Sequence, residues 1–305
     1  MRLIRAIDEL RPFARGVFVP TMGALHEGHA ALVRRARAIA GPGESVLVSI
    51  FVNPTQFAPG EDFARYPRTL DADIALAESA GADVVFAPDV ETVYPTGRAE
   101  APFAAPPLPS VATAPKLEDA HRPSHFAGVC QVVARLFDLV QPRVAVFGEK
   151  DFQQLRVIES LVAMVAAATP ARWPVWRDGC TVPGVAGVSH PAIVGHPTVR
   201  EPDGLAMSSR NRYLDAAQRE RALGLSRALR SAAAAQRPAA AERAMRETLV
   251  AHGLSVDYAV VRDAATLMPV ESLERPTRAL IAARIDPSRP DSVRLIDNAA
   301  MPVRR

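Results

Sequence analysis

Two histidines three positions apart stand where a short apolar run gives way to an expected helix. The segment Pro20–His29 (PTMGALHEGH) follows the apolar run Val17–Val19 and leads into a helix expected over about 28–40. Such a turn presents free backbone N–H groups and the positive end of a helix to an anion. Because histidine carries protons near neutral pH, His26 and His29 on one helical turn suit a phosphate group. The alternative is that both histidines only cap the helix.

Two more polar segments follow apolar runs of strand length. In FVNPTQF, at 51–57, the amides of Asn53 and Gln56 suit hydroxyl and carboxylate groups, although Asn-Pro is also an ordinary turn signal. In VFGEKDFQQ, at 146–154, Lys150 is a mobile point charge that can reach phosphate oxygens. Asp151 either holds a metal ion or caps the following helix, and the residues alone leave both interpretations open.

A fourth segment, VREPDGLAMSSRN at 199–211, contains two adjacent hydroxyls beside an arginine. Ser208, Ser209 and Arg210 form a flexible oxyanion clamp, which is useful where charge develops during phosphoryl or nucleotidyl transfer. Alone, such a triplet is usually a loop, so its meaning depends on the other three segments. The residue four positions after His26 is Ala30, which leaves the zinc-binding HExxH pattern poorly supported.

Alternating strands and helices are expected to position these segments. Apolar runs at 45–52, 83–86 and 143–147 predict strands, and helical spacing is present at 69–80, 128–140 and 152–168. This alternation predicts an α/β fold with a doubly wound, Rossmann-like parallel sheet. In such sheets ligands bind beyond the carboxyl ends of the strands, which places the loops at 20–29, 53–56 and 148–151 on one rim. The proline-rich stretch Ala101–Pro123 is expected to be an extended surface loop.

The sequence changes character after Tyr213. Residues 215–252 predict helices interrupted at Pro238, and the runs at 256–262, 277–285 and 292–297 predict an antiparallel sheet. We therefore expect a Rossmann-like domain over 1–198, with an irregular insertion at about 169–191. A second, smaller α+β domain over 199–305 is expected to carry the MSSRN clamp.

Composition excludes several classes of protein. The chain has 305 residues, 49% of them hydrophobic, with a net charge of +3, which excludes whole-chain disorder. Its longest apolar run, Leu161–Ala168, is too short to span a bilayer, and Met1–Leu10 lacks the pattern of a secretory signal, so we expect a cytoplasmic protein without a membrane partner. Cys130 and Cys180 cannot make a disulfide framework.

Arginine dominates the basic residues. Of 36 cationic residues only Lys116 and Lys150 are lysines, and the arginines are interspersed with acidic residues. A basic nucleic-acid-binding protein without catalysis remains a remote alternative, and it predicts an arginine stripe on one face. We expect no nucleic-acid partner.

Together the segments resemble the pantothenate synthetase (pantoate–β-alanine ligase) family of the HxGH nucleotidyl-transferase superfamily. The resemblance covers nearly the whole chain in order. It rests on PTMGALHEGH, FVNPTQF, YPRT at 66–69, RPSHFAGV at 122–129, FGEKDFQQ and PTVREPDGLAMSSRNRYL, with VDYAVVRD and RLIDN near the end.

The resemblance implies ATP-dependent condensation of (R)-pantoate with β-alanine. Pantoate first attacks the α-phosphorus of Mg-ATP, which releases pyrophosphate and leaves pantoyl adenylate. The amine of β-alanine then displaces AMP to give pantothenate. The family also implies Mg²⁺ as cofactor and a homodimer. A related nucleotidyltransferase acting on another small acid or phosphate ester is the alternative, although two glutamine amides in the acid pocket favour a hydroxy acid over a phosphorylated one.

Site residues are carried over by position. Catalytic roles fall on His29, as proton donor, and on His26, Lys150, Ser208, Ser209 and Arg210. The resemblance implies that Gln56, Gln154 and Asn53 bind pantoate and that Gln56 also binds β-alanine. Either Asp71 or Asp73 is expected to contact the metal ion. The residues implied for ATP are Met22, Gly23, Ala24, Leu25, His26, Glu27, Gly28, His29, Gly148, Glu149, Lys150, Asp151, Val199, Met207, Ser208, Ser209 and Arg210.

Overall fold

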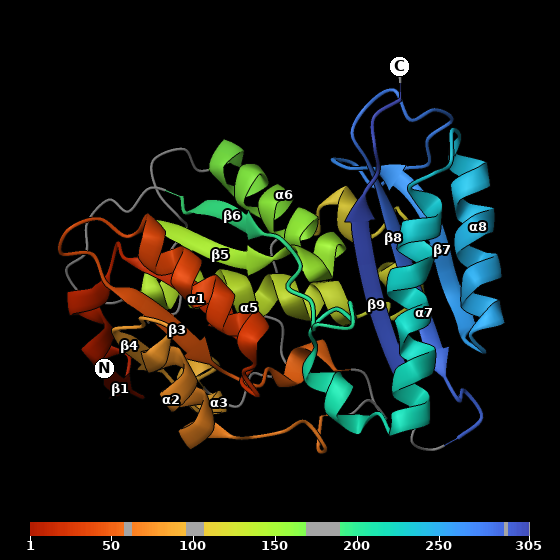
Figure 1. The fold of residues 1–305 in the computed structure, drawn as a ribbon. Helices are drawn as coiled ribbons and strands as arrows, with labels where there is room; N and C mark the ends of the chain where they lie inside the picture. Colours follow the sequence, from red (N-terminus) through yellow and green to blue (C-terminus); the bar gives the residue numbers. More distant parts are fainter. Residues whose placement is uncertain (58–62, 96–106, 169–189, 290–291, 305) are drawn as a thin grey trace.

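The computed structural model describes the chain except residues 58–62, 96–106, 169–189, 290–291 and 305 (Figure 1). Two sheets organise the described residues: a six-stranded parallel sheet and a three-stranded antiparallel sheet. The insertion expected at about 169–191 lies outside the described residues except for its last two positions, and Cys180 lies outside them as well. Cys130 is buried, which raises the pKa of its thiol to about 12 and leaves it protonated.

The parallel sheet has the strand order β1-β4-β3-β2-β5-β6. The chain runs outward from β2 to β3 and β4, then returns to place β5 on the other side of β2. This reversal between β2 and β5 is where a doubly wound sheet opens a crevice at its carboxyl edge. The strands are β1 (Arg2–Ile4), β2 (Val17–Thr21), β3 (Val46–Ile50), β4 (Val84–Phe86), β5 (Val144–Gly148) and β6 (Ala192–His196).

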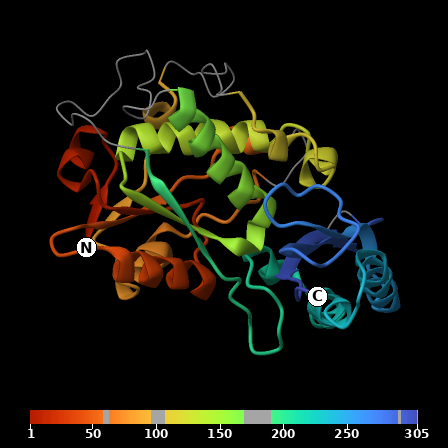
Figure 2. The same ribbon diagram turned by 90° about the horizontal axis from the view of Figure 1, so that it is seen from above.

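Both faces of the parallel sheet are covered, because side chains alternate along each strand. Val17 and Val19 pack with α1 and α2 on one face, whereas Phe18 packs with α5 and α6 on the other. Figure 2 shows the sheet between these two helical layers. The four helices are α1 (Glu27–Ile39), α2 (Leu70–Ser79), α5 (His125–Val140) and α6 (Phe152–Ala168). The predicted doubly wound α/β fold is confirmed.

The antiparallel sheet has one face for its own helices and one face for the rest of the molecule. Ile281 and Leu295 pack with α7 and α8, whereas Tyr258, Leu280 and Ala282 pack against Leu117 and Phe152 of the parallel-sheet part. The smaller α+β unit is therefore confirmed, while its boundary at residue 199 stays a prediction. Its elements are α7 (Ala216–Ala232), α8 (Pro238–Ala251), β7 (Ser255–Asp263), β8 (Thr277–Ile285) and β9 (Val293–Ala300).

The prediction of an extended loop over 101–123 is wrong in its described part, 107–123. That part contains a 3-10 turn and the short helix α4, which begins at the buried Glu118 and follows the buried Leu117. Tertiary contacts, described below, hold this helix against the antiparallel sheet. The remaining short elements are η1 (Asp8–Phe13), η2 (Pro54–Gln56), α3 (Val90–Val93), η3 (Ser110–Ala112), α4 (Glu118–His121), η4 (Glu149–Asp151) and η5 (Ser209–Tyr213).

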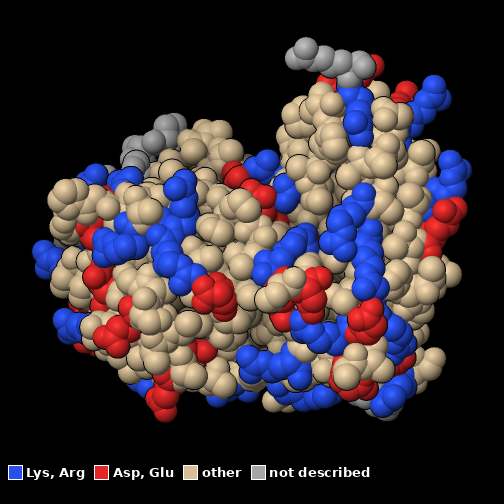
Figure 3. Space-filling model, in the orientation of Figure 1, with Lys and Arg blue, Asp and Glu red and all other residues tan. Residues whose placement is uncertain are grey.

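The surface mixes charges of both signs. The face in Figure 3 carries basic and acidic side chains beside one another over both parts of the molecule. Arg219, for example, pairs with Glu201 at 2.6 Å and Asp203 at 2.5 Å, and Arg221 pairs with Asp286 at 2.7 Å. Among the described residues, no helix has the length and apolar character needed to cross a membrane.

Candidate active site

A cleft of about 240 Å³ opens at the carboxyl ends of β2, β3 and β5, at the reversal of strand order. A second cavity of about 410 Å³ lies between this edge and the antiparallel sheet. The two cavities adjoin, since several residues line both. The shared residues are Arg122, His125, Lys150, Asp151, Gln154, Ser208 and Arg210.

His26 and His29 form a reciprocal cap at the start of α1. The backbone N–H of Gly28 donates to Nδ1 of His26 at 3.1 Å, and the backbone N–H of His26 donates to Nδ1 of His29 at 3.3 Å. Because an accepting Nδ1 carries no proton, the proton of each neutral ring sits on Nε2. The cap therefore fixes the tautomer of two rings that line the cleft. Capping and ligand binding are compatible here, because they use different nitrogens.

Both imidazoles are neutral at pH 7 in the free protein. Burial, followed by the charge of Lys150, lowers the pKa of His26 to about 4. Burial, followed by the charges of His26 and Lys150, lowers the pKa of His29 to about 3. A neutral ring still donates one hydrogen bond through Nε2, and a bound polyphosphate would favour its protonated form.

Asp73 supports the loop that precedes these histidines. Its carboxylate accepts hydrogen bonds from the backbone N–H groups of Ala24, at 2.9 Å, and Leu25, at 2.7 Å. Ala24 has a φ of +50°, an unfavourable conformation for a residue with a side chain, so these bonds stabilise a strained turn. Asp71 is exposed at the start of α2, and neither aspartate lines the two cavities.

The two predicted amide side chains after β3 are both buried, and both make hydrogen bonds within the protein. Asn53 is 1% exposed; its Nδ2 donates to the Gly128 carbonyl at 3.2 Å, and its Oδ1 accepts from the Tyr94 hydroxyl at 2.9 Å. Gln56 accepts from Asn53 and donates to Sδ of Met22 at 2.8 Å. Asn53 therefore positions Gln56.

The two neighbouring glutamines at the start of α6 differ in the hydrogen bonds of their side chains. Gln153 is buried and makes three hydrogen bonds to the proline-rich segment, with the backbone N–H of Glu118 at 2.9 Å among them. Gln154 lines both cavities and has no hydrogen-bond partner in the described part of the chain. Its amide is therefore available to a ligand.

One wall of the cleft comes from the buried helix α5. A Cβ on Gly128 would lie 2.3 Å from the Thr55 carbonyl oxygen, so glycine lets this helix touch the turn that carries Gln56. His125 bonds the Gln56 carbonyl through Nδ1 at 3.2 Å, and Arg122 approaches Nε2 of His125 at 3.3 Å. The apolar residues facing the cleft at helical spacing are Val129, Val132, Val133 and Leu136.

The clamp, Ser208–Arg210, follows a small hairpin. The backbone N–H of Met207 donates to the Val199 carbonyl at 3.0 Å, and an isolated bridge joins Arg200 to Ala206. The Ser208 hydroxyl accepts from the backbone N–H of Arg210 at 3.3 Å. The clamp and Lys150 line the same cleft from separate elements.

Most of the expected site residues line the cavities. Those present are Met22, His26, Gly28, His29, Asn53, Gln56, Gly148, Lys150, Asp151, Gln154, Val199, Met207, Ser208, Ser209 and Arg210. Five expected ATP contacts do not line them: Gly23, Ala24, Leu25, Glu27 and Glu149. The first three shape the loop, Glu27 pairs with Arg34 at the surface, and Glu149 pairs with Arg278 at 2.9 Å.

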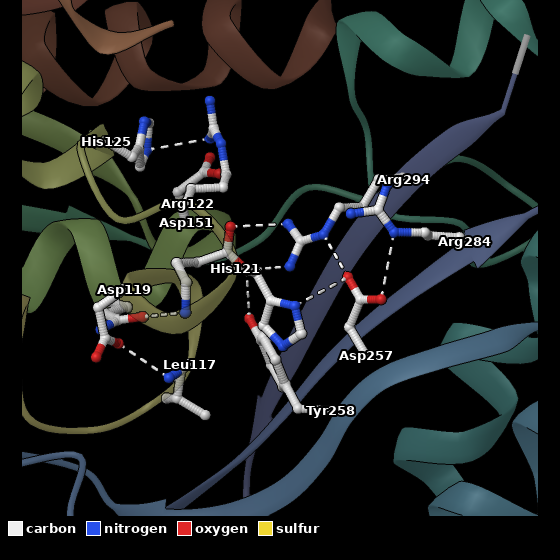
Figure 4. Close-up of polar contacts among 12 residues, drawn as sticks. Leu117, Asp119, His121, Arg122, His125, Asp151, Asp257, Tyr258, Arg284 and Arg294 are labelled. Atoms are coloured by element: carbon white, nitrogen blue, oxygen red, sulfur yellow. Dashed lines mark hydrogen bonds and ion pairs between the residues drawn. The ribbon is translucent and has the colours of Figure 1, made fainter. Parts of the chain in front are cut away.

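Residues that the sequence did not single out complete the enclosure. Arg122 and His125 lie within RPSHFAGV, but only the fold brings them against Gln56. Arg294 holds the carboxylate of Glu118 in two hydrogen bonds, at 2.7 and 2.8 Å, and the Tyr258 hydroxyl donates to it at 2.8 Å (Figure 4). Burial alone would raise the pKa of Glu118, but the hydrogen bonds and charge of Arg294 lower it to about 2.

The polar contacts between α4 and the antiparallel sheet, called the seam below, also include Asp257. This carboxylate accepts from Nε of Arg294 at 2.7 Å and of Arg284 at 3.3 Å, and Nδ1 of His121 lies 3.8 Å away (Figure 4). Charged side chains thus join α4 to the antiparallel sheet beside the second cavity. This explains why a short helix replaces the expected extended loop.

Comparison with known proteins gives a consistent result. A family model described as pantoate-beta-alanine ligase matches residues 2–178 and 187–300. The pantothenate synthetase of Rubrobacter xylanophilus is 47% identical, covering 99% of this chain and 98% of the relative. That of Geobacter sulfurreducens is 42% identical, covering 99% of both.

Solved structures agree. A pantothenate synthetase from Thermus thermophilus has a TM-score of 0.82 and 42% identity, covering 98% of this chain and 99% of the other. A pantoate-beta-alanine ligase from Francisella tularensis, complexed with beta-gamma ATP and beta-alanine, has a TM-score of 0.71 and 29% identity. It covers 98% of this chain and 97% of that one.

Proposed function

We propose how the residues of this chain, which belongs to the pantoate–beta-alanine ligase family, divide the ATP-dependent condensation of (R)-pantoate with β-alanine. Pantothenate, AMP and pyrophosphate are the products, and pantoyl adenylate is the intermediate. The alternatives of another nucleotidyltransferase substrate or a non-catalytic nucleic-acid-binding protein are set aside by the full-length similarity.

We propose that the triphosphate binds between the histidine pair, Lys150 and the clamp. The supporting observation is that these groups reach one cleft from three separate elements. His26 and His29 would donate through Nε2, while Lys150 and Arg210 would supply positive charge. As the pantoate carboxylate oxygen attacks the α-phosphorus, the bond to the β-phosphate breaks and negative charge grows on the phosphate oxygens. Donors already in place stabilise that charge without reorganising.

Pantoate fits the part of the cleft next to Gln56 and Gln154. Their amides suit a carboxylate and hydroxyls, and the apolar wall of α5 suits the two methyl groups of this acid. Asn53 acts indirectly, by holding Gln56. In the second step the amine nitrogen of β-alanine bonds to the acyl carbon, loses a proton, and AMP leaves with the bonding electrons. Gln56 is the proposed contact for β-alanine as well.

Magnesium is proposed to enter with ATP. Mg²⁺ commonly uses substrate phosphates with only one or two carboxylates from the protein. Among the described residues, no cluster of three or more His, Cys, Asp or Glu side chains offers a complete site. Neither aspartate of the predicted pair fits the ion: both oxygens of Asp73 already accept hydrogen bonds, and Asp71 is exposed and lines neither cavity.

A cytoplasmic homodimer is proposed from the family resemblance. Light scattering during size-exclusion chromatography would give the mass in solution, and a monomeric mass would contradict the dimer. Cell fractionation would test the location.

The decisive experiment is to assay the two half reactions separately. Exchange of labelled pyrophosphate into ATP should require pantoate and proceed without β-alanine. AMP and pantothenate should appear together once β-alanine is added, as measured by mass spectrometry. Exchange that ignores pantoate, or an adenylated acid that never forms an amide, would contradict the proposal.

A further inference from the structure

Asn298 on β9 holds the turn that carries Lys150. Its Nδ2 donates to the carbonyl oxygens of Glu149, at 2.9 Å, and Lys150, at 2.8 Å. Nε of Arg278 donates to Oδ1 of Asn298 at 2.7 Å, and the Arg278 guanidinium stacks 4.1 Å from the centre of the Phe152 ring. Because Oδ1 is committed to Arg278, the amide can face the turn only through its N–H groups.

Asp297, the preceding residue, holds the hairpin that leads to the clamp. Its two oxygens accept from Nη2 and Nη1 of Arg200 at 3.0 and 2.8 Å, and it is 2% exposed. Nη1 of Arg200 also donates to the Gly204 carbonyl at 3.0 Å, inside the hairpin. The carboxylate therefore fixes Arg200, and Arg200 fixes the backbone from which the clamp extends.

Asp297 and Asn298 are adjacent residues that contact different elements, because β9 is an extended strand in which successive side chains point to opposite faces. Leu295, two residues before Asp297, packs toward α7 and α8, whereas Ile296 packs toward the parallel-sheet part. One dipeptide therefore reaches two elements that lie about 50 positions apart in the sequence. The carbonyl oxygen of Asn298 also accepts from Nη2 of Arg200 at 3.5 Å, so Asn298 itself bonds both the Lys150 turn and the Arg200 hairpin.

We propose that Asp297 and Asn298 are positioning residues that set the separation of Lys150 from the clamp and thereby the rate of adenylation. The inference rests on the proposed phosphate-binding roles of these two elements. Both groups must meet the same triphosphate while charge develops on it, and a displacement of ~1 Å can cost ~100-fold in rate. Attack of the amine on the finished adenylate no longer involves the β- and γ-phosphates, so it should depend less on this spacing.

Asn298→Asp tests the contact of Asn298 with the Lys150 turn while leaving the shape of the side chain almost unchanged. The new carboxylate keeps its bond to Arg278 but turns an oxygen toward two carbonyl oxygens, which repels the Lys150 turn. Pantoate-dependent pyrophosphate exchange should fall ~10- to 100-fold. The reaction of preformed pantoyl adenylate with β-alanine should fall less than ~3-fold, so that the ratio of the two rates changes. Equal losses in both steps, or no loss in exchange, would overturn the inference.

A double mutant separates positioning from general damage. If Asn298 acts through Lys150, then adding Asn298→Asp to Lys150→Ala should slow exchange by less than ~3-fold more. Additive losses would refute that route. Asp297→Asn independently tests the contact of Asp297 with Arg200, and it should also lower the rate of pyrophosphate exchange more than the rate of aminolysis.

Asp257→Asn is the matched control, since Asp257 bonds Arg294 across the same seam but touches neither phosphate-binding element. It should lower the melting temperature and leave the ratio of the two rates unchanged; a changed ratio would count against the inference. The wild-type exchange assay keeps the questions apart. A wild-type protein without pantoate-dependent exchange refutes the proposed function, whereas normal exchange in Asn298→Asp refutes only the positioning role.

Discussion

We expect the two ring nitrogens of His29 to have separate tasks, with Nδ1 capping α1 and Nε2 donating to phosphate, and two substitutions separate them. Asparagine can place an oxygen near the Nδ1 position, where it accepts the backbone N–H of His26, but it leaves nothing at Nε2. Glutamine can place an N–H near the Nε2 position and cannot easily reproduce the cap. The pair therefore tests catalysis and stability independently, with each variant as the control for the other.

The two variants should change catalysis and stability by different amounts. Loss of one donor to the developing phosphate charge costs ~3–4 kcal/mol, so His29→Asn should lower kcat/KM by ~10²- to 10³-fold. Its free energy of unfolding should change by less than ~0.5 kcal/mol, because the cap is kept. His29→Gln should keep kcat within ~10-fold but lose ~1 kcal/mol of stability, the usual value of a helix cap.

Acid unfolding provides a second measurement. Because burial lowers the pKa of His29 to about 3 in the folded state, the unfolded chain binds more protons between that value and the ordinary 6.5. Stability must therefore fall as the pH is lowered, by ~1.4 kcal/mol per pH unit for this group, or ~2 kcal/mol between pH 7 and 5. Urea unfolding at the two pH values should show a smaller loss in both variants than in the wild type. Identical pH dependence in all three proteins, or full activity in His29→Asn, would refute the reasoning.

Three further predictions concern the walls of the site. Gln154→Ala should raise the KM for pantoate at least ~10-fold without changing the melting temperature, whereas Gln153→Ala should destabilise by ~1–3 kcal/mol because it leaves buried partners unpaired. Gly128→Ala should raise the KM for pantoate and cost ~1–3 kcal/mol, because its Cβ would lie 2.3 Å from a carbonyl oxygen; Gly41→Ala, with no atom nearer than 3.6 Å, is the control. Glu118→Gln should cost ~3 kcal/mol at pH 7 in urea unfolding, and this difference should shrink as the pH falls from 4.5 toward 2, where the wild-type carboxylate takes up its own proton.

Local sequence signals predicted the regular elements well where the signal was long. The helix expected at 152–168 has those bounds in the structure, because seventeen residues of helical spacing leave little ambiguity. The strands β1 and β6 were missed. The first has one buried residue, unlike the equally short but wholly buried β4, and the second contains Gly195, so neither shows a strand pattern without the parallel neighbour that completes its hydrogen bonds.

Local sequence also predicted some residues of the candidate site and not others. Motifs that lie directly after strands, such as those of His29 and Lys150, could be placed on one rim because parallel strands end together. The role of Asn298 could not, since its bond to Lys150 spans 148 positions. The apolar positions of α5 at 129, 132, 133 and 136 carry the same spacing as a core helix, and only the fold shows that this stripe borders a ligand cleft.

The dependence of the Lys150 turn on β9 has a consequence for how the molecule matures. The parallel sheet is built from contacts among residues before 197, whereas the hydrogen bonds that hold the Lys150 turn and the Arg200 hairpin come from residues 297 and 298. Pairings between distant segments form slowly, because the intervening chain must first be closed into a loop. During synthesis the ribosome must release almost the entire polypeptide before Lys150 and the clamp acquire their final spacing. If Asp297 and Asn298 set this spacing as we propose, a nascent chain with a complete parallel sheet should adenylate its substrate more slowly than the finished protein.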